Sequence, residues 1–215
     1  MDQAVFRLIN ERWTSPALDL FMAGISDLGM WQPLLILAVL YALIFGGFKG
    51  RAFAVCAGVS ILLSEALLIN SLKNAVDRPR PKQVETVRMV QLQQATPRFL
   101  TLFKAPTIRY SSERDRFTSG ASFPSGHTAN NVTIAICATL FFRRWGWLYF
   151  LVAAAVGYSR VYLGAHWPSD VLATALMAAG ETLLVIGLAE LVWRWGAARW
   201  VPELFARHPR LIQLA

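Results

Sequence analysis

Residues 122–131 read SFPSGHTANN and lead directly into the apolar run VTIAICATLFF (132–142). Such a run is typical of a helix that enters a membrane. Ser125, Gly126 and His127 therefore lie at a predicted membrane boundary. A histidine there is either the polar end of a span or part of an active site, and residues elsewhere in the chain decide between the two.

The whole chain is unusually apolar. Of its 215 residues 55% are hydrophobic, with 8 Trp and 13 Phe, more than a water-soluble domain of this length normally has. Five runs approach the ~20 apolar residues that a helix needs to cross a bilayer. The sequence therefore predicts an all-α fold, a polytopic transmembrane helical bundle. The runs are WQPLLILAVLYALIFGG (31–47), FAVCAGVSILLSEALLIN (53–70), TANNVTIAICATLFF (128–142), WLYFLVAAAVGYSRVYL (147–163) and VLATALMAAGETLLVIGLAELVW (171–193).

The N-terminal residues 1–30 are harder to classify. Their segment ALDLFMAGISDLGM (17–30) is apolar but short, and it contains Asp19 and Asp27. We interpret 1–30 as an interfacial or half-inserted helical segment, with a sixth span as the alternative. It does not resemble a removable signal peptide. The predicted organisation is completed by one membrane domain (31–200) and a cytoplasmic tail (201–215).

The formal charge of +8 is distributed in a way that points to a membrane rather than to nucleic acid. Basic residues follow the first, third and fifth predicted spans, which lie on one side if the spans alternate. This is the positive-inside pattern. It predicts a multi-pass protein of the plasma (inner) membrane, with the loops 73–127 and 159–170 facing the periplasm or exterior. The basic residues are Lys49, Arg51, Arg143, Arg144, Arg194, Arg199, Arg207 and Arg210.

Two further residue types receive no chemical role. Cys56 and Cys137 lie inside predicted spans without a C-x-x-C pattern, and we interpret them as small packing residues. His208 lies in the predicted tail, where the sequence offers it no partner.

Three cations gather at the predicted outer face. Lys73 ends the second span, Arg80 follows it, and Arg160 lies near the end of the fourth. Only Asp77 and Asp170 are acidic residues close to them in sequence. Two unit charges ~4 Å apart interact by about 4 kcal/mol at an effective dielectric near 20, so the cluster favours an anionic guest. Phosphate fits, because guanidinium and ammonium groups both bind its oxygens.

The PSGH segment adds donors of another kind. Gly126 allows the backbone to approach a ligand, and Ser125 offers a hydroxyl. The N-terminus of the following helix adds free N–H groups and a partial positive charge. Together these features are typical of an anion-binding cradle, although PSG alone is also an ordinary turn and helix cap.

Two histidines complete the outer-face group. Asp170, four residues after His166, can accept a hydrogen bond from one imidazole nitrogen and leave the other free as a nucleophile. His127 can supply a proton to a leaving oxygen. The alternatives are a local structural hydrogen bond or a zinc site formed by these three residues, but the neighbouring cations would repel a metal dication.

Three segments together resemble the signature of the type 2 phosphatidic acid phosphatase superfamily. The signature is Lys, six residues, Arg-Pro; then Pro-Ser-Gly-His; then Ser-Arg, five residues, His, three residues, Asp. All eleven specified residues are present with intact spacing. They are Lys73, Arg80, Pro81, Pro124, Ser125, Gly126, His127, Ser159, Arg160, His166 and Asp170.

The resemblance implies a role for most of these residues. His166 would attack phosphorus and form a phosphohistidine, Asp170 would orient it, and His127 would protonate the leaving group. The phosphoryl oxygens would be held by Lys73, Arg80, Ser125, Gly126 and Arg160. No metal or other cofactor is implied. Arg78 lacks the family's spacing from Lys73 and is interpreted as an auxiliary surface charge.

The loop between the first two motifs, residues 82–123, is the hardest part to interpret. Its segment VETVRMVQLQQ (84–94) is mildly amphipathic and is a candidate lid on the membrane surface, with the later arginines facing a second phosphate or an anionic headgroup. A solvated loop attracted to anionic lipid is the alternative.

These features favour a membrane enzyme that removes a terminal phosphate from a lipid phosphate or diphosphate. Undecaprenyl diphosphate is the first candidate substrate, with phosphatidylglycerol phosphate and lipid A 1-phosphate as alternatives. A lipid phosphotransferase would use the same intermediate. A vanadium haloperoxidase shares the anion motif but is not expected to contain membrane spans, and a non-catalytic lipid-binding protein would not need both histidines and Asp170.

Overall fold

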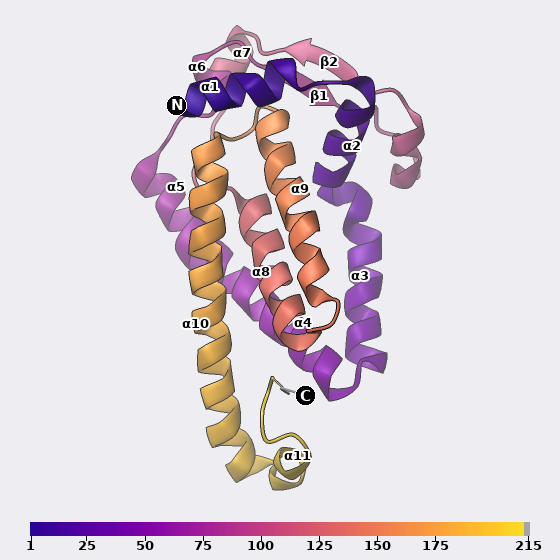
Figure 1. Ribbon diagram of the computed structural model, residues 1–215, viewed down its shortest axis with the longest axis vertical. Coiled ribbons are helices and arrows are strands. Elements are labelled where there is room, and N and C mark those ends of the chain that lie inside the picture. Colours follow the sequence, from indigo (N-terminus) through magenta and orange to yellow (C-terminus); the bar gives the residue numbers. More distant parts are fainter. Residues whose placement is uncertain (213–215) are drawn as a thin grey trace.

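The computed structural model describes residues 1–212. They form a bundle of long helices that is covered at one end by short helices and a small sheet (Figure 1). A helix occupies each of the five predicted apolar runs. The bundle helices are α3 (Leu28–Phe45), α4 (Gly47–Leu63), α8 (Gly126–Phe141), α9 (Tyr149–Tyr162) and α10 (Pro168–Trp200).

Helix α8 is the most enclosed of the five and packs against α4, α9 and α10. Ala135 and Cys137 on α8 are fully buried, and Cys56 on α4 is nearly so. Both cysteines are free, which agrees with their interpretation as small packing residues. Small side chains let helices approach closely where lipid supplies no hydrophobic force between them. Thr133 and Thr182 add a buried hydroxyl hydrogen bond of 2.9 Å between α8 and α10.

Three helical stretches of the described residues are long and apolar enough to cross a membrane: Leu28–Phe45, Gly47–Val84 and Pro168–Trp200. Helices α8 and α9 have 16 and 14 residues. At 1.5 Å per residue they are ~24 and ~21 Å long, shorter than the ~30 Å hydrocarbon core. The prediction of a polytopic helical bundle is therefore confirmed, while the number of five to six crossings stays a prediction.

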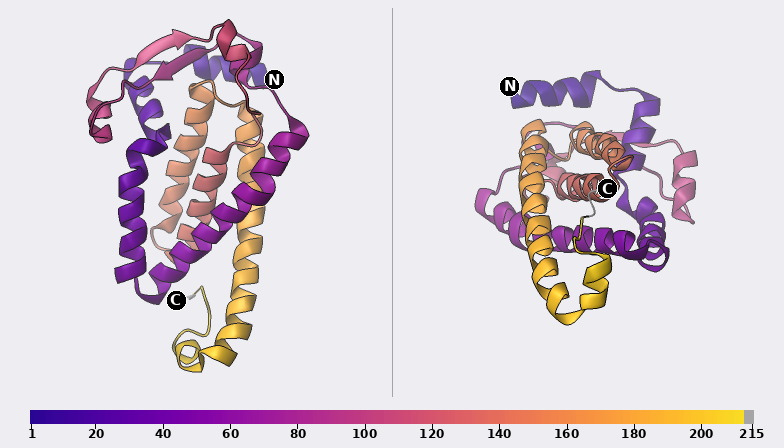
Figure 2. Two further views of the ribbon diagram at one scale, coloured as in Figure 1. Left: turned by 180° about the vertical axis from the view of Figure 1, so that it is seen from behind. Right: turned by 60° about the horizontal axis from the view of Figure 1, so that its bottom comes forward.

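The helix of the second predicted span is not a regular α-helix along its whole length. Helix α4 continues through a π-helical turn, η2 (Ser64–Ile69), into α5 (Asn70–Val76), and Figure 2 shows this path running obliquely across the bundle. Helix α5 stops at Asp77, whose φ of 40° is left-handed. Asp is among the few residues other than Gly that tolerate this conformation. The chain turns here, and Arg78 and Arg80 follow on the covered end of the bundle.

The cover contains the N-terminal segment and most of the loop 82–123 (Figure 1). Two antiparallel strands pair with Arg88 opposite Tyr110 and Gln91 opposite Thr107. The rest of the cover consists of short helices. In chain order, the helices and strands of the cover are α1 (Asp2–Arg7), η1 (Leu8–Arg12), α2 (Pro16–Ser26), α6 (Pro81–Val84), β1 (Arg88–Gln91), η3 (Arg98–Phe103), β2 (Thr107–Tyr110) and α7 (Glu113–Arg116).

The amphipathic segment 84–94, the candidate lid, contains a strand, and its role as a lid stays a prediction. Its central residues form β1, in which Arg88 and Val90 are buried and Gln91 is exposed. This alternation is that of a half-buried strand. Two of the later arginines have partners within the cover, since Arg109 pairs with Asp115 at 2.7 Å and Arg116 with Glu113 at 3.2 Å.

A buried ion pair attaches β1 to the N-terminal segment. The two terminal nitrogens of Arg88 donate to the two carboxylate oxygens of Asp19 at 2.8 and 2.6 Å. Tyr162 at the end of α9 donates its hydroxyl to the same carboxylate at 2.6 Å. Asp19 is 2% exposed and Arg88 8%. The pair thus joins α2, β1 and α9 above the bundle.

The C-terminal segment folds back under the opposite end (Figure 2). After α11 (Pro202–Arg207), the backbone N–H groups of Leu211 and Ile212 donate to Glu190. His208, expected to have no partner, stacks on Phe48 with ring centroids 4.2 Å apart. The last three residues of the predicted tail, 213–215, lie outside the described residues.

Removal of Asp19 is expected to destabilise the cover. Asp19→Ala would leave the buried guanidinium of Arg88 uncompensated, a change that typically costs about 3–5 kcal/mol. Thermal unfolding of the purified protein in detergent measures the loss. The control, Glu113→Gln, removes an exposed pair and should change stability little. Equal unfolding temperatures for Asp19→Ala and wild type would contradict the role given to this pair.

Candidate active site

The residues of the three motifs meet where the bundle and its cover join. Lys73 lies on α5, Arg80 precedes α6, and Arg160 is in the last turn of α9. His127 in the first turn of α8 interacts electrostatically with all three cations. His166, in the turn between α9 and α10, interacts with Arg160, Arg80 and His127. The structure thus brings residues up to 93 positions apart into one group.

The turn that positions His166 is tight. Gly164 has a φ of +73°, and a Cβ at this position would lie 2.2 Å from a methyl carbon of Val87. Glycine is needed for both reasons. Pro168 then begins α10 at a position where its missing N–H costs nothing. His166 is consequently held in a short segment fixed at both ends and is only 4% exposed.

The imidazole of His166 does not bind Asp170 in the way expected from the sequence. Its Nδ1 lies 2.5 Å from the backbone carbonyl oxygen of Ser122. Because a carbonyl can only accept, Nδ1 is the protonated nitrogen and Nε2 carries the free lone pair. The expected tautomer is thus obtained with a different partner, and the direct hydrogen bond to Asp170 was a wrong prediction.

Asp170 is connected to His166 only indirectly, through Ser122. Its Oδ2 accepts hydrogen bonds from the Ser122 hydroxyl at 2.5 Å and from the Trp167 backbone N–H at 3.0 Å. Its Oδ1 accepts from Arg78 at 2.6 Å. Asp170 is fully buried, and both of its oxygens have partners. The interpretation of Arg78 as an auxiliary surface charge was therefore also wrong.

The three motif cations have no carboxylate partner within residues 1–212. Arg80 donates to the carbonyl oxygen of Gly120 at 3.2 Å. Arg160 donates to the Ser26 hydroxyl, and its buried Nε has no hydrogen-bond partner among residues 1–212. A buried donor without a partner is costly. Together with Lys73, these groups favour an anion that binds between them.

Ser125 and Gly126 form the start of α8. The Ser125 backbone N–H donates to Thr174 at 3.0 Å, and the Ser125 hydroxyl oxygen accepts from Thr128 at 3.0 Å. The hydroxyl proton of Ser125 is thus left for another acceptor. A Cβ at Gly126 would lie 3.8 Å from its nearest neighbours, Glu65 and Ile69. The protein itself leaves room there, which a ligand oxygen can use.

Burial and the neighbouring cations keep His166 neutral. Burial, Arg160 and Arg80, in that order, lower the pKa of His166 to about 3. The folded protein therefore disfavours the protonated imidazole well below neutral pH. An unprotonated Nε2 is the form required of a nucleophile.

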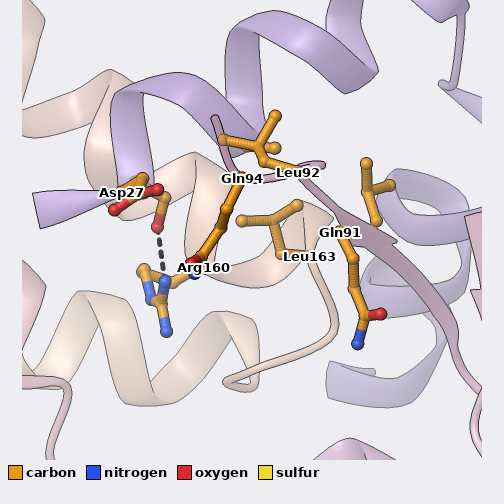
Figure 3. A pocket seen from close by; sticks show the side chains of 9 residues that line it. Asp27, Gln91, Leu92, Gln94, Arg160 and Leu163 are labelled. Carbon is orange, nitrogen blue, oxygen red and sulfur yellow. Dashed lines mark hydrogen bonds between the residues drawn. The ribbon is translucent and has the colours of Figure 1, made fainter. Parts of the chain in front are cut away.

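A cavity of about 540 Å³ opens beside Arg160 (Figure 3). It lies between α2, the end of α9 and the strand β1. Asp27, Gln91 and Gln94 supply polar groups, and Leu92 and Leu163 supply apolar ones. The site therefore has space next to Arg160.

A metal site is not supported by the geometry. Within the described residues 1–212, no group of three His, Cys, Asp or Glu side chains is arranged to hold a metal ion. The oxygens of Asp170, one of the three conceivable zinc ligands, are already bound to Arg78, Ser122 and Trp167.

Fold and site together define a helical membrane protein in which two histidines and three cations meet at one end of the bundle. The chain belongs to the PAP2 superfamily, whose family model matches residues 53–195. Three curated relatives illustrate the match. A bacitracin transport permease protein BcrC from Bacillus licheniformis is 43% identical over 32% of this chain and 34% of its own length. The undecaprenyl-diphosphatase BcrC of Bacillus subtilis is 28% identical over 75% and 69%.

The third relative, a lipid A 4'-phosphatase from Bacteroides thetaiotaomicron, is 27% identical over 76% of this chain and 66% of its own length. The chain thus spans between a third and about two thirds of these relatives. Family membership and relatives named as phosphatases support a phosphoric ester hydrolase.

Two solved structures have the same fold. Aquifex aeolicus LpxE gives a TM-score of 0.59 at 28% identity and covers 86% of this chain and 94% of its own. A transmembrane PAP2-type phosphatidylglycerolphosphate phosphatase from Bacillus subtilis gives 0.55 at 23% identity, with coverage of 88% and 87%. At that identity the second likeness shows the fold alone.

The free space at Gly126 leads to a test of the anion cradle. Gly126→Ala should fold with wild-type stability, because the new methyl group makes only ordinary contacts with protein atoms. The variant should bind orthovanadate, a phosphate analogue, more weakly, because the methyl group occupies the space of a ligand oxygen. Thermal unfolding and vanadate titration measure the two effects. Unchanged vanadate affinity would show that no ligand uses this space.

Proposed function

We propose that the protein is a metal-independent membrane phosphatase that removes a terminal phosphate from a lipid phosphate or diphosphate through a phosphohistidine on His166. The observation that carries this proposal is the buried His166, whose Nε2 has no hydrogen-bond partner among the described residues. Its protonated Nδ1 is fixed by the Ser122 carbonyl, and it lies among cations without carboxylate partners. The proposed nucleophile and the proposed anion-binding groups therefore lie side by side.

The reaction has two steps. In the first, Nε2 of His166 forms a bond to phosphorus while the bond from phosphorus to the leaving oxygen breaks. His127, protonated once the bound phosphate offsets the charge of the neighbouring cations, gives its proton to that oxygen. In the second, water attacks the phosphohistidine, His127 takes a proton from this water, and phosphate leaves. His166 and His127 are then regenerated.

The phosphate-binding residues stabilise the charge of both transition states. Phosphoryl transfer asks mainly for positioning and for charge stabilisation on the equatorial oxygens. Lys73, Arg80 and Arg160 supply the charge, and Ser125 and Gly126 supply donors and space. Asp170 acts in this scheme through Ser122, since that residue separates it from the imidazole.

Undecaprenyl diphosphate is the first candidate substrate. Relatives named undecaprenyl-diphosphatase support it, and relatives named lipid A phosphatase support lipid A phosphates as the alternative. Phosphatidylglycerol phosphate is a further alternative. In the proposed topology the basic C-terminal end is cytoplasmic and the site faces the periplasm or exterior. The helices α8 and α9 then lie within the bilayer inside the bundle.

A phosphate-release assay tests the function. Purified protein is given undecaprenyl diphosphate, phosphatidylglycerol phosphate, phosphatidic acid or lipid A, with EDTA present throughout. We expect phosphate release from at least one lipid. His166→Ala should lower turnover about 10³-fold or more, as removal of a nucleophile does in other enzymes. Absence of release from every lipid, or full turnover in His166→Ala, would contradict the proposal.

Labelled substrate separates hydrolysis from phosphotransfer. With water as the acceptor, the label appears as free phosphate. Transfer to a second lipid would place it in a new lipid product, which would change the acceptor and leave the histidine chemistry intact.

A further inference from the structure

Arg78 lies at the centre of a hydrogen-bond network behind the active site. Its Nη1 donates to Asp170 at 2.6 Å and to the Ser169 hydroxyl at 2.8 Å, and its Nη2 donates to Asp2 at 2.6 Å. Asp2 also accepts from the hydroxyl and the backbone N–H of Ser169, at 2.6 and 3.0 Å. The guanidinium thus joins the N-terminal helix α1 to the first turn of α10.

Arg78 holds Ser122 from two directions. Its backbone carbonyl oxygen accepts from the Ser122 N–H at 2.7 Å. Its side chain binds Asp170, whose other oxygen accepts from the Ser122 hydroxyl. The carbonyl of Ser122 is the group that contacts Nδ1 of His166. The location of that carbonyl therefore depends on Arg78 through both its backbone and its side chain.

Aromatic rings enclose this network. The guanidinium of Arg78 lies 5.8 Å from the centre of the Trp167 ring, a cation–π contact,. Trp167 donates its Nε1–H to the carbonyl of Pro79 at 2.9 Å. Phe6 of α1 packs on the same ring with centroids 5.1 Å apart. Helix α1 therefore covers the network with an apolar side chain as well as binding it through Asp2.

Arg78 and Arg80 are two residues apart but have opposite electrostatic surroundings. Arg78 is bound to two carboxylates, Asp2 and Asp170. Arg80, within the described residues, donates its side chain only to a carbonyl oxygen. A guanidinium between two carboxylates has little net attraction left for phosphate, whereas one without a carboxylate retains it. The contacts therefore separate a structural arginine from an anion-binding one.

We propose that Arg78 and Asp2 are positioning residues for the reaction: they fix Asp170 and Ser122, and through the Ser122 carbonyl they set the orientation and tautomer of His166. This inference rests on the proposed function and adds to it a contribution from α1. The N-terminal helix, outside the three sequence motifs, belongs to the support of the nucleophile.

Kinetics of purified variants test the proposal. In Arg78→Gln we expect kcat to fall about 10–100-fold, the usual effect of losing a partner that orients an imidazole, with KM and inhibition by inorganic phosphate, which need not bond to the imidazole, unchanged. Arg78→Lys should recover part of the activity, because an ammonium still pairs with a carboxylate. Asp2→Ala should also lower kcat, but by a smaller factor than Arg78→Gln, because Arg78 and Asp170 remain paired.

Two control variants separate positioning from other roles. Arg7→Gln removes the ion pair between α1 and Glu85, 2.8 Å long, without touching Asp170, and should leave kcat unchanged. Arg80→Gln removes an anion-binding group and should weaken inhibition by inorganic phosphate. All rates are referred to folded protein, measured by size-exclusion chromatography and thermal unfolding.

The outcomes distinguish this inference from the function on which it rests. An inactive wild type would contradict the proposed function. An active wild type with normal kcat in both Arg78→Gln and Asp2→Ala would overturn the positioning role. Weakened inhibition by inorganic phosphate in Arg78→Gln, equal to that in Arg80→Gln, would overturn it too, because Arg78 would then bind the anion. If Arg78→Gln does not fold, the comparison of Asp2→Ala with Arg7→Gln decides.

Discussion

Electrostatic repulsion between three cations is the constraint on which the site depends. Lys73, Arg80 and Arg160 come from different elements and all interact with His127, and Arg80 and Arg160 interact with His166 as well. Like charges at such a place oppose folding unless the rest of the structure holds them. The rest of the fold keeps the cations in place, and a phosphate bound between them would relieve the repulsion. Burial, together with Arg160 and Arg80, lowers the pKa of His166 and favours its unprotonated form, so the same arrangement suits both the proposed anion site and the proposed nucleophile.

The cover over the bundle serves the same constraint. The Arg88 and Asp19 pair fixes β1 and α2 above α9, and the Asp2 and Arg78 pair fixes α1 above α10. In both cases a carboxylate of the N-terminal segment neutralises an arginine of a distant segment. Arg78 and Arg88, which have carboxylate partners, thus support the structure, whereas Lys73, Arg80 and Arg160, which have none within the described residues, are the cations that we propose bind the anion.

The sequence predicted the helices well, because apolar runs are local signatures, and the spacing of the motifs selected residues that the structure brings together. Apolar runs identify α3, α4, α8, α9 and α10, and the motif spacing selects His127 and His166. The contact between His166 and Ser122 was not predictable, since any residue type can supply a backbone carbonyl. Arg78 looked redundant beside Arg80, and only the fold brings Asp2 to it. The strand β1 depends on pairing with β2, about twenty residues away. The number of crossings is unresolved because α8 is enclosed by protein and need not be a long lipid-facing helix.

The most direct test of the central claim is an experimental structure with bound orthovanadate. The account predicts vanadium bonded to Nε2 of His166, with its oxygens in contact with Lys73, Arg80 and Arg160, and with Nδ1 still on the Ser122 carbonyl. Vanadate bound to His127 instead, or an imidazole turned so that Nε2 faces Ser122, would contradict it.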